Sequence, residues 1–240
     1  MGVVKRSRFF DLNVHSLPDY ADSPGRMVLE AKELAYSGIC LTSFNPSNSF
    51  HDPDISSSLY EDFEIYNGIE IEVNSVSGLN KQVNRLRGNA NIILASGGHE
   101  KINRAALENQ KIDVLTHPAS GGKPLNHVLT KAAADNGVAI DFNIGALTMY
   151  TGGFRTRILA AMRLNVRLVR KYDASMILTS GARSHYDLRG PREMMALGMI
   201  MGMTQDEALH ALSIVPQAII RRNTDENRIM KGVEIVDVVQ

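Results

Sequence analysis

The sequence contains little or none of several residue types, and each shortage narrows the possibilities. Its single cysteine, Cys40, has no partner for an internal disulfide and lies in an apolar run, which predicts a reduced, intracellular protein. Tryptophan is absent and aromatic residues make up 6% of the chain, which disfavours a base-stacking platform for single strands. No run of about 18 apolar residues occurs, and no apolar segment follows the basic N-terminus as a secretion signal requires. We therefore expect a cytoplasmic protein.

Length and composition indicate one globular domain. The chain has 240 residues, of which 44% are hydrophobic and 22% are charged, close to the ordinary globular mix of roughly 45–50% and ~25%. A disordered, collagen-like or coiled-coil protein is therefore excluded. We expect residues 1–240 to form a single domain, with the polar tail from about residue 223 at its periphery.

Short apolar runs alternate with segments of helical periodicity. The runs predict strands at residues 9–14, 39–42, 69–73, 92–95, 114–116, 138–142 and 176–179. The segments between them predict helices at residues 24–37, 78–87, 101–109, 124–136, 156–172 and 191–203. This alternation is typical of a parallel sheet with helical crossovers, buried on both faces. The predicted fold class is α/β, as a TIM-type (β/α) barrel.

Local signals support several of these boundaries. Ser23-Pro24 predicts a helix start, Thr204 and Glu207 have capping-box spacing, and Gly137 stands where a glycine often ends a helix. Residues 45–58, with two prolines and five serines, predict a long loop after the second strand. The alternation of charged and apolar residues at 233–239 predicts an edge strand.

Polar residues gather where the predicted strands end, which is where β/α barrels carry their chemistry. Five motifs are of this kind: DLNVHS at 11–16, TSFN at 42–45, GIEIE at 68–72, THP at 116–118 and SGARS at 180–184. In that order they resemble the metal-binding motifs of the polymerase and histidinol phosphatase (PHP) superfamily of barrel phosphoesterases. The resemblance implies a PHP-like barrel.

Many of the metal ligands of that superfamily are missing here. A histidine is replaced by Asn13, an Asp-His pair by Ser43 and Phe44, and a second aspartate and histidine by Gly181 and Arg183. Two or three divalent ions need several imidazoles and carboxylates, and an arginine at the rim repels a cation and suits an anion. We therefore predict no metal site, no catalytic residue, and a vestigial rim of Asp11, Asn13, His15, Glu70 and His117. The alternative is a free-standing, metal-dependent phosphoesterase that uses the last three of these residues.

Longer strings carry a more specific resemblance. FDLNVH at 10–15, AKELAYSG at 31–38 and above all SGARSHYDLRGPREMMALG at 180–198 resemble the archaeal ribonuclease P protein component 3 family, and the likeness extends over about residues 9–222. The resemblance implies a subunit of the ribonucleoprotein that removes 5′ leaders from precursor tRNA, in which the RNA is catalytic. It implies as partners the ribonuclease P RNA, precursor tRNA, protein component 2 and the other protein subunits, and no membrane. It implies no cofactor for this chain, since Mg²⁺ serves the RNA-containing holoenzyme.

The net charge of zero hides a strong segregation along the chain. Residues 11–72 carry twelve acidic and two basic groups, whereas residues 73–192 carry seven acidic and seventeen basic groups. Residues 142–172 hold six bases and no acid, and helical spacing places Arg163, Arg167, Arg170 and Lys171 near one face. These patterns predict a basic surface for RNA and an acidic segment that faces a basic partner. For the helix alone, a solvated amphipathic face is the alternative.

Basic residues are the candidates for RNA contact. Three arginines within ten residues, Arg183, Arg189 and Arg192, follow the seventh predicted strand. Lys123 follows two glycines that allow backbone N–H groups to approach a phosphate, although an ordinary turn explains the glycines equally well. The remaining candidates, for which simple solvation is the alternative, are Arg155, Arg157, Arg167, Arg85, Arg87 and Arg104.

Overall fold

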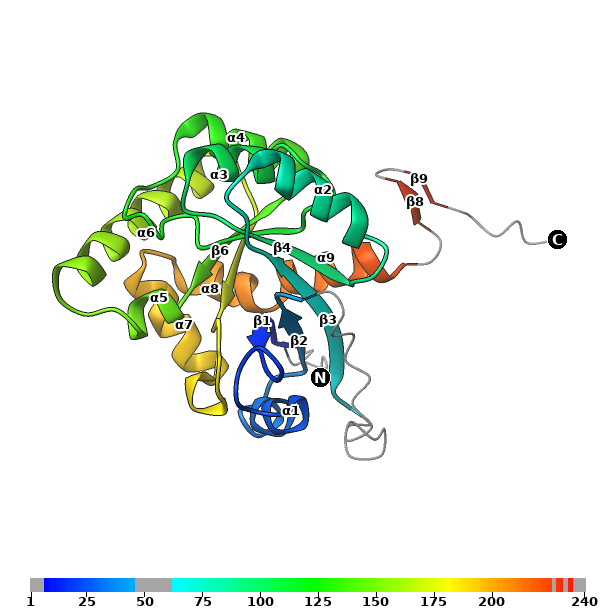
Figure 1. Cartoon of the computed structure of the whole chain (residues 1–240). Coiled ribbons are helices and arrows are strands. Elements are labelled where there is room, and N and C mark those ends of the chain that lie inside the picture. Colours follow the sequence, from blue (N-terminus) through cyan, green and yellow to red (C-terminus); the bar gives the residue numbers. More distant parts are fainter. Residues whose placement is uncertain (1–6, 46–61, 226–227, 231–232, 235–240) are drawn as a thin grey trace, which may run out of the picture.

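The computed structural model of the chain describes residues 7–45, 62–225, 228–230 and 233–234, the last two stretches by their backbone alone. In these ranges seven parallel strands form one sheet in sequence order (Figure 1). They are β1 (Phe10–His15), β2 (Gly38–Ser43), β3 (Glu64–Ile71), β4 (Ile92–Ser96), β5 (Val114–Thr116), β6 (Ala139–Asn143) and β7 (Met176–Thr179). All seven predicted strands are confirmed, but β3 begins five residues earlier than expected and ends two residues earlier.

Each strand of the sheet pairs in parallel with the next. The two ends of the sheet meet through a parallel bridge between Val14 and Ala182. There the backbone N–H of His15 donates to the carbonyl of Ala182 at 2.8 Å. The result is a single α/β TIM-like domain with seven strands, as the alternation of strands and helices predicted.

Helices surround the barrel, and most follow a strand and return the chain to the start of the next one (Figure 1). They are α1 (Pro24–Glu33), α2 (Val76–Leu86), α3 (Glu100–Leu107), α4 (His127–Asn136), α5 (Gly145–Thr148), α6 (Gly152–Tyr172), α7 (Pro191–Ile200), α8 (Gln205–Leu212) and α9 (Ile214–Thr224), with a 3-10 turn η2 (His185–Asp187). The six predicted helices are present with shifted ends, whereas α5, α8 and α9 were not among them. Within the described residues, no helix is both long and apolar enough to span a bilayer.

The expected capping signals work as the sequence suggested. The Ser23 side chain accepts from the backbone N–H of Arg26 at the start of α1, and Thr204 with Glu207 forms a complete capping box at the start of α8. Gly137 ends α4 with φ of 69°, a left-handed conformation that glycine adopts without a steric penalty. These contacts fix where the helices begin and end relative to the strands.

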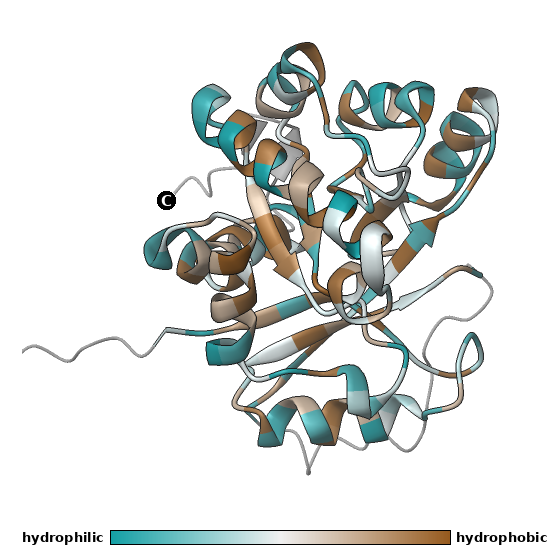
Figure 2. Cartoon of the chain, turned by 90° about the vertical axis from the view of Figure 1, so that its left-hand side faces the viewer, coloured by the Kyte–Doolittle hydropathy of each residue, from teal (hydrophilic) through white to brown (hydrophobic). Residues whose placement is uncertain are grey.

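Hydrophobic residues fill two layers (Figure 2). The outer and larger layer lies between the strands and helices α2 to α8. The second layer lies inside the ring, where Phe10, Leu12, Ile92 and Leu94 pack together with residues of α9. Because α9 packs against the interior cluster and follows the helices that return from β7, it closes the amino-terminal end of the barrel and leaves the carboxyl end for polar groups.

The C-terminal segment differs in part from its prediction. β8 (Arg228–Met230) and β9 (Val233–Glu234) pair antiparallel in a separate two-stranded sheet, outside the barrel (Figure 1). The predicted edge strand is confirmed for residues 233–234, although it pairs with β8 and not with the barrel sheet, and residues 235–240 lie outside the described ranges. The predicted loop at 45–58 lies outside them from residue 46 onward.

Candidate functional site

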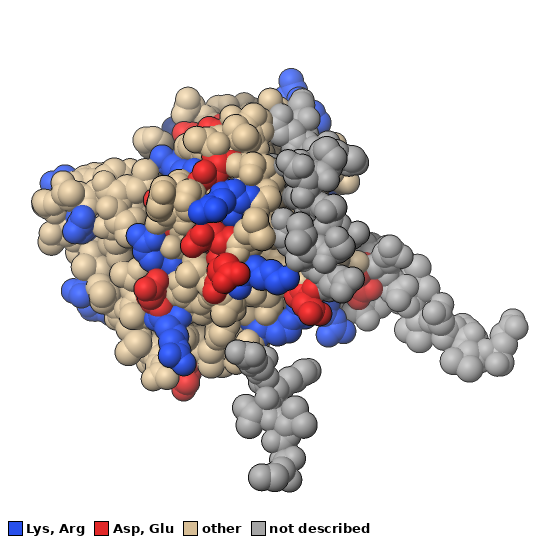
Figure 3. All heavy atoms as spheres, turned by 90° about the horizontal axis from the view of Figure 1, so that it is seen from below, with Lys and Arg blue, Asp and Glu red and all other residues tan. Residues whose placement is uncertain are grey.

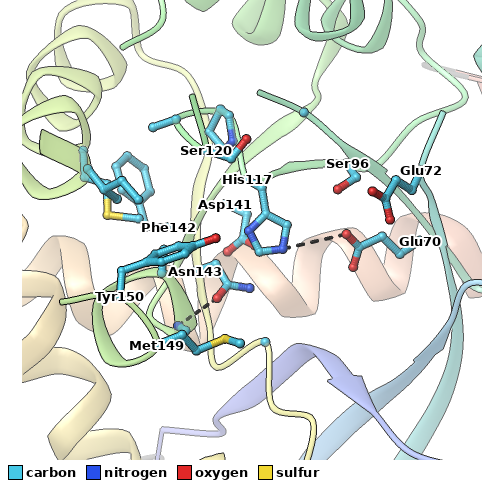
Figure 4. Close-up of a pocket in the computed structure, with 18 of the residues that line it drawn as sticks. Glu70, Glu72, Ser96, His117, Ser120, Asp141, Phe142, Asn143, Met149 and Tyr150 are labelled. Carbon is cyan, nitrogen blue, oxygen red and sulfur yellow. Dashed lines mark hydrogen bonds and ion pairs between the residues drawn. The ribbon is translucent and has the colours of Figure 1, made fainter. Parts of the chain in front are cut away.

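A cavity of about 270 Å³ opens at the carboxyl ends of the strands. Its lining includes His15 of β1, Glu70 of β3, His117 after β5, Asn143 of β6 and Arg183 after β7. In Figure 4, Glu70, Glu72 and Ser96 lie on one side of this space, and Asn143 and Tyr150 lie on the other. The expectation that polar strand ends meet at one rim is confirmed.

Glu70 is the centre of the predicted vestigial rim. Its Oε2 accepts from Asn13 Nδ2 at 3.3 Å and lies 3.2 Å from His15 Nε2, while Oε1 lies 3.8 Å from His117 Nε2. Burial alone raises the pKa of this carboxyl, but the bond from His15 and the charges that His117 and His15 carry once protonated in acid outweigh burial and lower the pKa to about 2. Glu70 is therefore ionised at neutral pH and holds the two histidines in place.

His117 adopts an unusual backbone conformation, with φ of 52° in the left-handed region. Few residues other than glycine occupy this region, and such positions concentrate at functional sites. Burial lowers the pKa of the imidazole, and the ionised Glu70 opposes part of that effect. At neutral pH the ring is therefore uncharged and offers both a donor and an acceptor nitrogen.

Two aspartates lie beneath the rim, and both are fully buried. Asp11 accepts from the backbone N–H groups of Ser180 at 3.0 Å and Asn13 at 3.1 Å, which ties β1 to the end of β7. Asp141 accepts from the hydroxyl groups of two threonines that flank it on β5 and β7. Burial outweighs these bonds and raises the pKa of Asp11 to about 6 and that of Asp141 to about 8. Asp141 is therefore protonated at neutral pH.

The donor set does not fit a divalent-metal centre. Among the residues that the structure describes, no three His, Cys, Asp or Glu side chains are grouped so that they hold an ion. Where the PHP pattern has an aspartate, this chain has Gly181, and a Cβ there would lie 2.3 Å from Asn143 Nδ2. The Asn143 amide occupies the space that an aspartate at position 181 would need. The residues of the rim therefore do not fit a divalent metal ion.

Arg183 and Arg189 both follow β7, but they are held differently. Arg183 is exposed, lines the cavity and lies over the ring of Tyr20, 5.2 Å from its centroid. Arg189 donates through Nη1 to the carbonyls of Tyr186 and Leu188 at 2.6 and 2.7 Å. Arg183 therefore presents its charge at the mouth, whereas Arg189 stabilises its own loop.

Three other predicted contacts also lie on the mouth side. Arg155 and Arg157 are exposed in the first turns of α6, which follows β6, and Lys123 is exposed in the loop after β5. A Cβ on the neighbouring Gly122 would lie 3.8 Å from Arg157 Cβ, so this loop lies beside the start of α6. Arg192 is exposed in the first turn of α7, which begins beside the end of α1, since a Cβ on Gly190 would lie 3.9 Å from the Leu34 carbonyl.

Arg85 and Arg87 lie at the other end of the barrel. They occupy the last turn and C-cap of α2, which begins after β3 and returns toward the start of β4. Arg87 donates to the carboxylate of Asp113, just before β5, and to the carbonyls of Lys111 and Asn91. Arg85 and Arg87 therefore do not adjoin the mouth cavity, because a helix that leaves the carboxyl end of a strand ends at the opposite side, and RNA contact at these two residues stays a prediction.

The remaining predicted contacts lie on the outer helices. Arg104 is near the end of α3, within 3.9 Å of Glu100 and 3.5 Å of Glu108. Arg167 is exposed, about ten residues further along α6 than Arg157. Both lie away from the cavity, whose lining includes neither of them.

Two arginines that the helical spacing placed beside Arg167 pack against neighbouring elements. Arg163 Nε donates to the Ile200 carbonyl at 3.0 Å. Arg170 donates from Nε and Nη2 to the two oxygens of Glu207, each at 2.7 Å. Much of this charged face therefore joins α6 to α7 and α8, which the sequence pattern did not reveal.

Sequence reasoning missed several residues of the cavity. Asn143 and Asp141 lie on β6, and Tyr150 and Asn165 lie beyond it, yet this strand was not among those inspected for polar ends. The signal was present, since Asp141-Phe142-Asn143 alternates polar and apolar residues within a buried strand. Asn165 gave no such signal, because one amide within an arginine-rich helix is an ordinary surface residue.

A family model identifies the chain. The model described as RNase P subunit p30 matches residues 8–228. The chain belongs to this family. It is 38% identical over 234 residues to ribonuclease P protein component 3 of Methanosarcina barkeri, with 97% of each chain covered. It is 33% identical over 240 residues to that of Methanothermobacter thermautotrophicus, with 95% of this chain and 96% of the relative covered. The chain is thus a subunit of ribonuclease P, which processes the 5′ leaders of tRNA, as predicted.

Solved structures show the same fold. A chain from the cryo-EM structure of archaeal ribonuclease P with mature tRNA superposes with a TM-score of 0.74 at 24% identity, covering 95% of this chain and 99% of the other. The histidinol phosphate phosphatase of Lactococcus lactis, solved with zinc, histidinol and phosphate, gives 0.58 at 14% identity, covering 82% and 95%. The predicted PHP-like barrel is therefore confirmed.

Proposed function

We propose that this subunit contacts RNA with the basic residues around its barrel mouth and has no catalytic step of its own. These residues, the mouth cluster, are Arg183, Lys123, Arg155 and Arg157, and all four are exposed. Their partners are phosphates of the ribonuclease P RNA or of precursor tRNA. In support, the archaeal ribonuclease P structure that contains a chain of similar fold was solved with mature tRNA. Exposed basic groups near one rim also favour the binding of a polyanion.

The observation that carries this proposal is Arg183 itself. It lines the cavity at the strand end where the PHP pattern has a metal ligand, and it faces outward over Tyr20. A guanidinium at such a position attracts phosphate and repels a divalent cation. The rest of the rim agrees, because Glu70 is bound by Asn13 and His15.

The acidic groups of residues 11–72 are only partly available to a basic partner. Asp11 and Glu70 are buried in the barrel, Asp22 lies 2.9 Å from His185 Nδ1, and Glu64 pairs with Arg8. Glu33, Asp62 and Glu72 are exposed, and three further acids of the segment lie outside the described residues. Figure 3 shows acidic and basic side chains interspersed on the face that it presents. That this segment faces a basic partner stays a prediction.

Protein component 2 is the partner that we propose for an apolar patch on the outer helices. Leu164 of α6 and Met199 and Ile200 of α7 are 43–49% exposed, and the bond from Arg163 Nε to the Ile200 carbonyl brings the two helices together. Exposed apolar groups that adjoin one another favour protein docking. We further propose a cytoplasmic location and no cofactor for this chain, in line with the buried Cys40 and the donor set of the rim.

Reconstitution tests the proposal. Precursor-tRNA cleavage is measured with the RNA subunit and the other proteins, with and without this chain and with Arg183→Ala, and the RNA is footprinted in parallel. We expect loss of cleavage without the chain, partial loss with the variant, and protected phosphates that the variant exposes. An unchanged footprint with Arg183→Ala would contradict the mouth as the RNA contact.

The free-standing phosphoesterase remains testable by itself. The purified chain is analysed for bound metal and assayed for phosphodiester hydrolysis in Mn²⁺, with His117→Ala as the comparison. We expect neither stoichiometric metal nor turnover, because the residual ligands are too few and are bound to one another. Stoichiometric metal with turnover abolished by His117→Ala would establish the enzyme instead.

A further inference from the structure

Three residues that line the mouth cavity each have a buried polar atom without a hydrogen-bond partner among the described residues. The three atoms are Asn143 Nδ2, Asn165 Nδ2 and His15 Nδ1. Their residues are only 1–3% exposed, so bulk water does not reach them freely. Buried polar groups in folded proteins are nearly always bonded, and a cluster of exceptions around one cavity points to something that binds there.

The orientation of both amides is fixed by the protein. Asn143 Oδ1 accepts from the backbone N–H of Gly145 at 2.8 Å, and Asn165 Oδ1 accepts from that of Leu125 at 2.7 Å. Since a backbone N–H only donates, neither amide can flip without losing its bond. Each Nδ2 is therefore a committed donor, and Figure 4 shows the Asn143 side chain directed into the space near His117 and Tyr150.

The opposite wall supplies acceptors, and aromatic rings line the space between. Glu72 and Ser96 line the cavity on the side away from Asn143 (Figure 4). The rings of Phe44 and Tyr150 belong to the same lining, and Phe44 is stacked on His15 with ring centroids 4.8 Å apart. A ligand that fits has acceptors on one edge, a donor on another and a flat apolar face.

A nucleobase has all three features, and a phosphate does not. Inside the cavity the ionised Glu70 repels an anion, Glu72 is a second acidic residue of the lining, and Arg183 is the single guanidinium among the described residues of that lining. A volume of about 270 Å³ lies near the lower end of the ~300–1,000 Å³ range of small-molecule pockets. That volume suits one small ring system, and excludes a helix of RNA.

We propose that the mouth cavity binds one unstacked cytosine of an RNA strand. Asn143 and Asn165 donate to the acceptors of its O2 and N3 edge, Glu72 accepts from its exocyclic amine, and Arg183 contacts the adjoining phosphate at the mouth. This inference rests on the proposed RNA contact, since Arg183 serves both. It adds base recognition to a surface that otherwise reads only charge.

Filling the cavity tests the inference. Ala146 of α5 lines it, and Ala146→Phe places a ring inside. The matched control is Ala218→Phe on the exposed side of α9, at the closed end of the barrel. The full chain is titrated with three RNA decamers: oligocytidine, oligouridine and an abasic ribose-phosphate chain.

We expect wild type and Ala218→Phe to bind oligocytidine about tenfold tighter than the abasic chain, the size expected for one seated base, and tighter than oligouridine. Ala146→Phe should bind all three alike. Equal binding of oligocytidine and the abasic chain by wild type, or a preference that survives in Ala146→Phe, overturns the base site and leaves the cavity to water.

A second variant serves if Ala146→Phe fails to fold, as judged by thermal unfolding. Asn143→Ala removes the donor without adding a charge or an O–H group, so the preference for oligocytidine should fall while abasic binding changes little. A retained preference overturns the proposal. Arg183→Ala tests the phosphate contact separately from the base site, because it should weaken the binding of all three decamers equally. If the affinity for none of them changes, the phosphate contact is contradicted, and the preference for oligocytidine still decides the base site.

Discussion

The amide of Asn143 lies against the bare Cα of Gly181. A Cβ atom at position 181 would come within 2.3 Å of Asn143 Nδ2 and 2.6 Å of its Oδ1, and Gly181 has φ of 57°. Two neighbouring strand ends therefore exclude each other's side chains: either position 181 carries a ligand, or position 143 carries this amide. In this chain position 143 carries the amide, and this uncharged group lines the cavity where a ligand at position 181 would otherwise lie.

Restoring an aspartate at this position should not restore a metal site. Gly181→Asp forces a side chain into the left-handed region and against Asn143, and we expect a loss of ~2 kcal/mol or more in the free energy of unfolding. The measurement is urea unfolding of the variant, with metal analysis of the purified protein. Stoichiometric metal would show that the rim still forms a site.

The chain offers a matched control for this variant. Gly152 has φ of 58°, and a Cβ there meets nothing within 4 Å. Gly152→Asp should therefore cost only the ~1 kcal/mol of the backbone conformation. Asn143→Ala combined with Gly181→Asp should recover part of the loss, because the two substitutions act on one contact. Equal losses at 181 and 152 would contradict the steric argument.

The barrel could be predicted from sequence because its signals are local. Apolar runs separated by helical periodicity identify the strands, and Ser23, Gly137 and Thr204 marked helix ends through bonds between residues close in sequence. The mouth was predictable in part, because strand order brings carboxyl ends together whatever the side chains do. His15, Glu70 and His117 were found in this way.

The use of each charged residue could not be predicted, because it depends on contacts distant in sequence. Arg87 and Arg183 are alike in sequence, but one meets Asp113 at the closed end and the other faces solvent at the mouth. The unpartnered state of Asn143 and Asn165 likewise follows from three-dimensional packing. The charge counts predicted a basic surface, but they could not predict which arginine and lysine residues form it.

Asp141 should make stability fall as pH rises. Its pKa is about 8 in the fold against 3.8 for an ordinary aspartate, so between these values the folded state binds a proton that the unfolded chain lacks. Unfolding stability then falls by up to ~1.4 kcal/mol per pH unit through this window. Asp141→Asn removes this titrating group and should flatten the slope between pH 6 and 8, whereas Asp11, with a pKa of about 6, contributes near pH 6 to the slopes of both proteins.

Urea unfolding at pH 6, 7 and 8 checks this prediction. Asp173→Asn is the control, since Asp173 is exposed at the C-cap of α6 and the same substitution there should leave the wild-type slope. The stability of Asp141→Asn should exceed that of wild type at pH 8 by more than at pH 6. Parallel curves for the two proteins would mean that Asp141 is ionised in the fold.

Alanine substitutions at Arg87 and Arg85 should differ in their effect on stability, because Arg87 has a structural contact and Arg85 lies at the surface. Arg87→Ala removes a partner of the buried Asp113 while Arg222 remains 2.7 Å from the other oxygen, so we expect a loss of ~1–3 kcal/mol. Arg85→Ala, at an exposed position two residues away, should change the stability by no more than ~0.5 kcal/mol. Thermal unfolding compares the two, and RNA affinity should be unchanged in both. A loss of RNA affinity in either variant would show that RNA also contacts the closed end of the barrel.

Arg183→Ala and Arg189→Ala should both reduce precursor-tRNA cleavage, but for different physical reasons. Arg183 is exposed at the mouth and makes one phosphate contact in our proposal, so Arg183→Ala should lower the slope of log affinity against log salt by ~0.7–0.9 and leave stability unchanged. Arg189 Nη1 donates to two loop carbonyls, so Arg189→Ala should lower stability by ~1 kcal/mol or more with the salt slope intact. Salt-dependent RNA titrations and thermal unfolding of the same preparations separate these effects. An unchanged slope in Arg183→Ala together with a reduced slope in Arg189→Ala would exchange the two assignments, because only a residue that neutralises a phosphate releases a counterion.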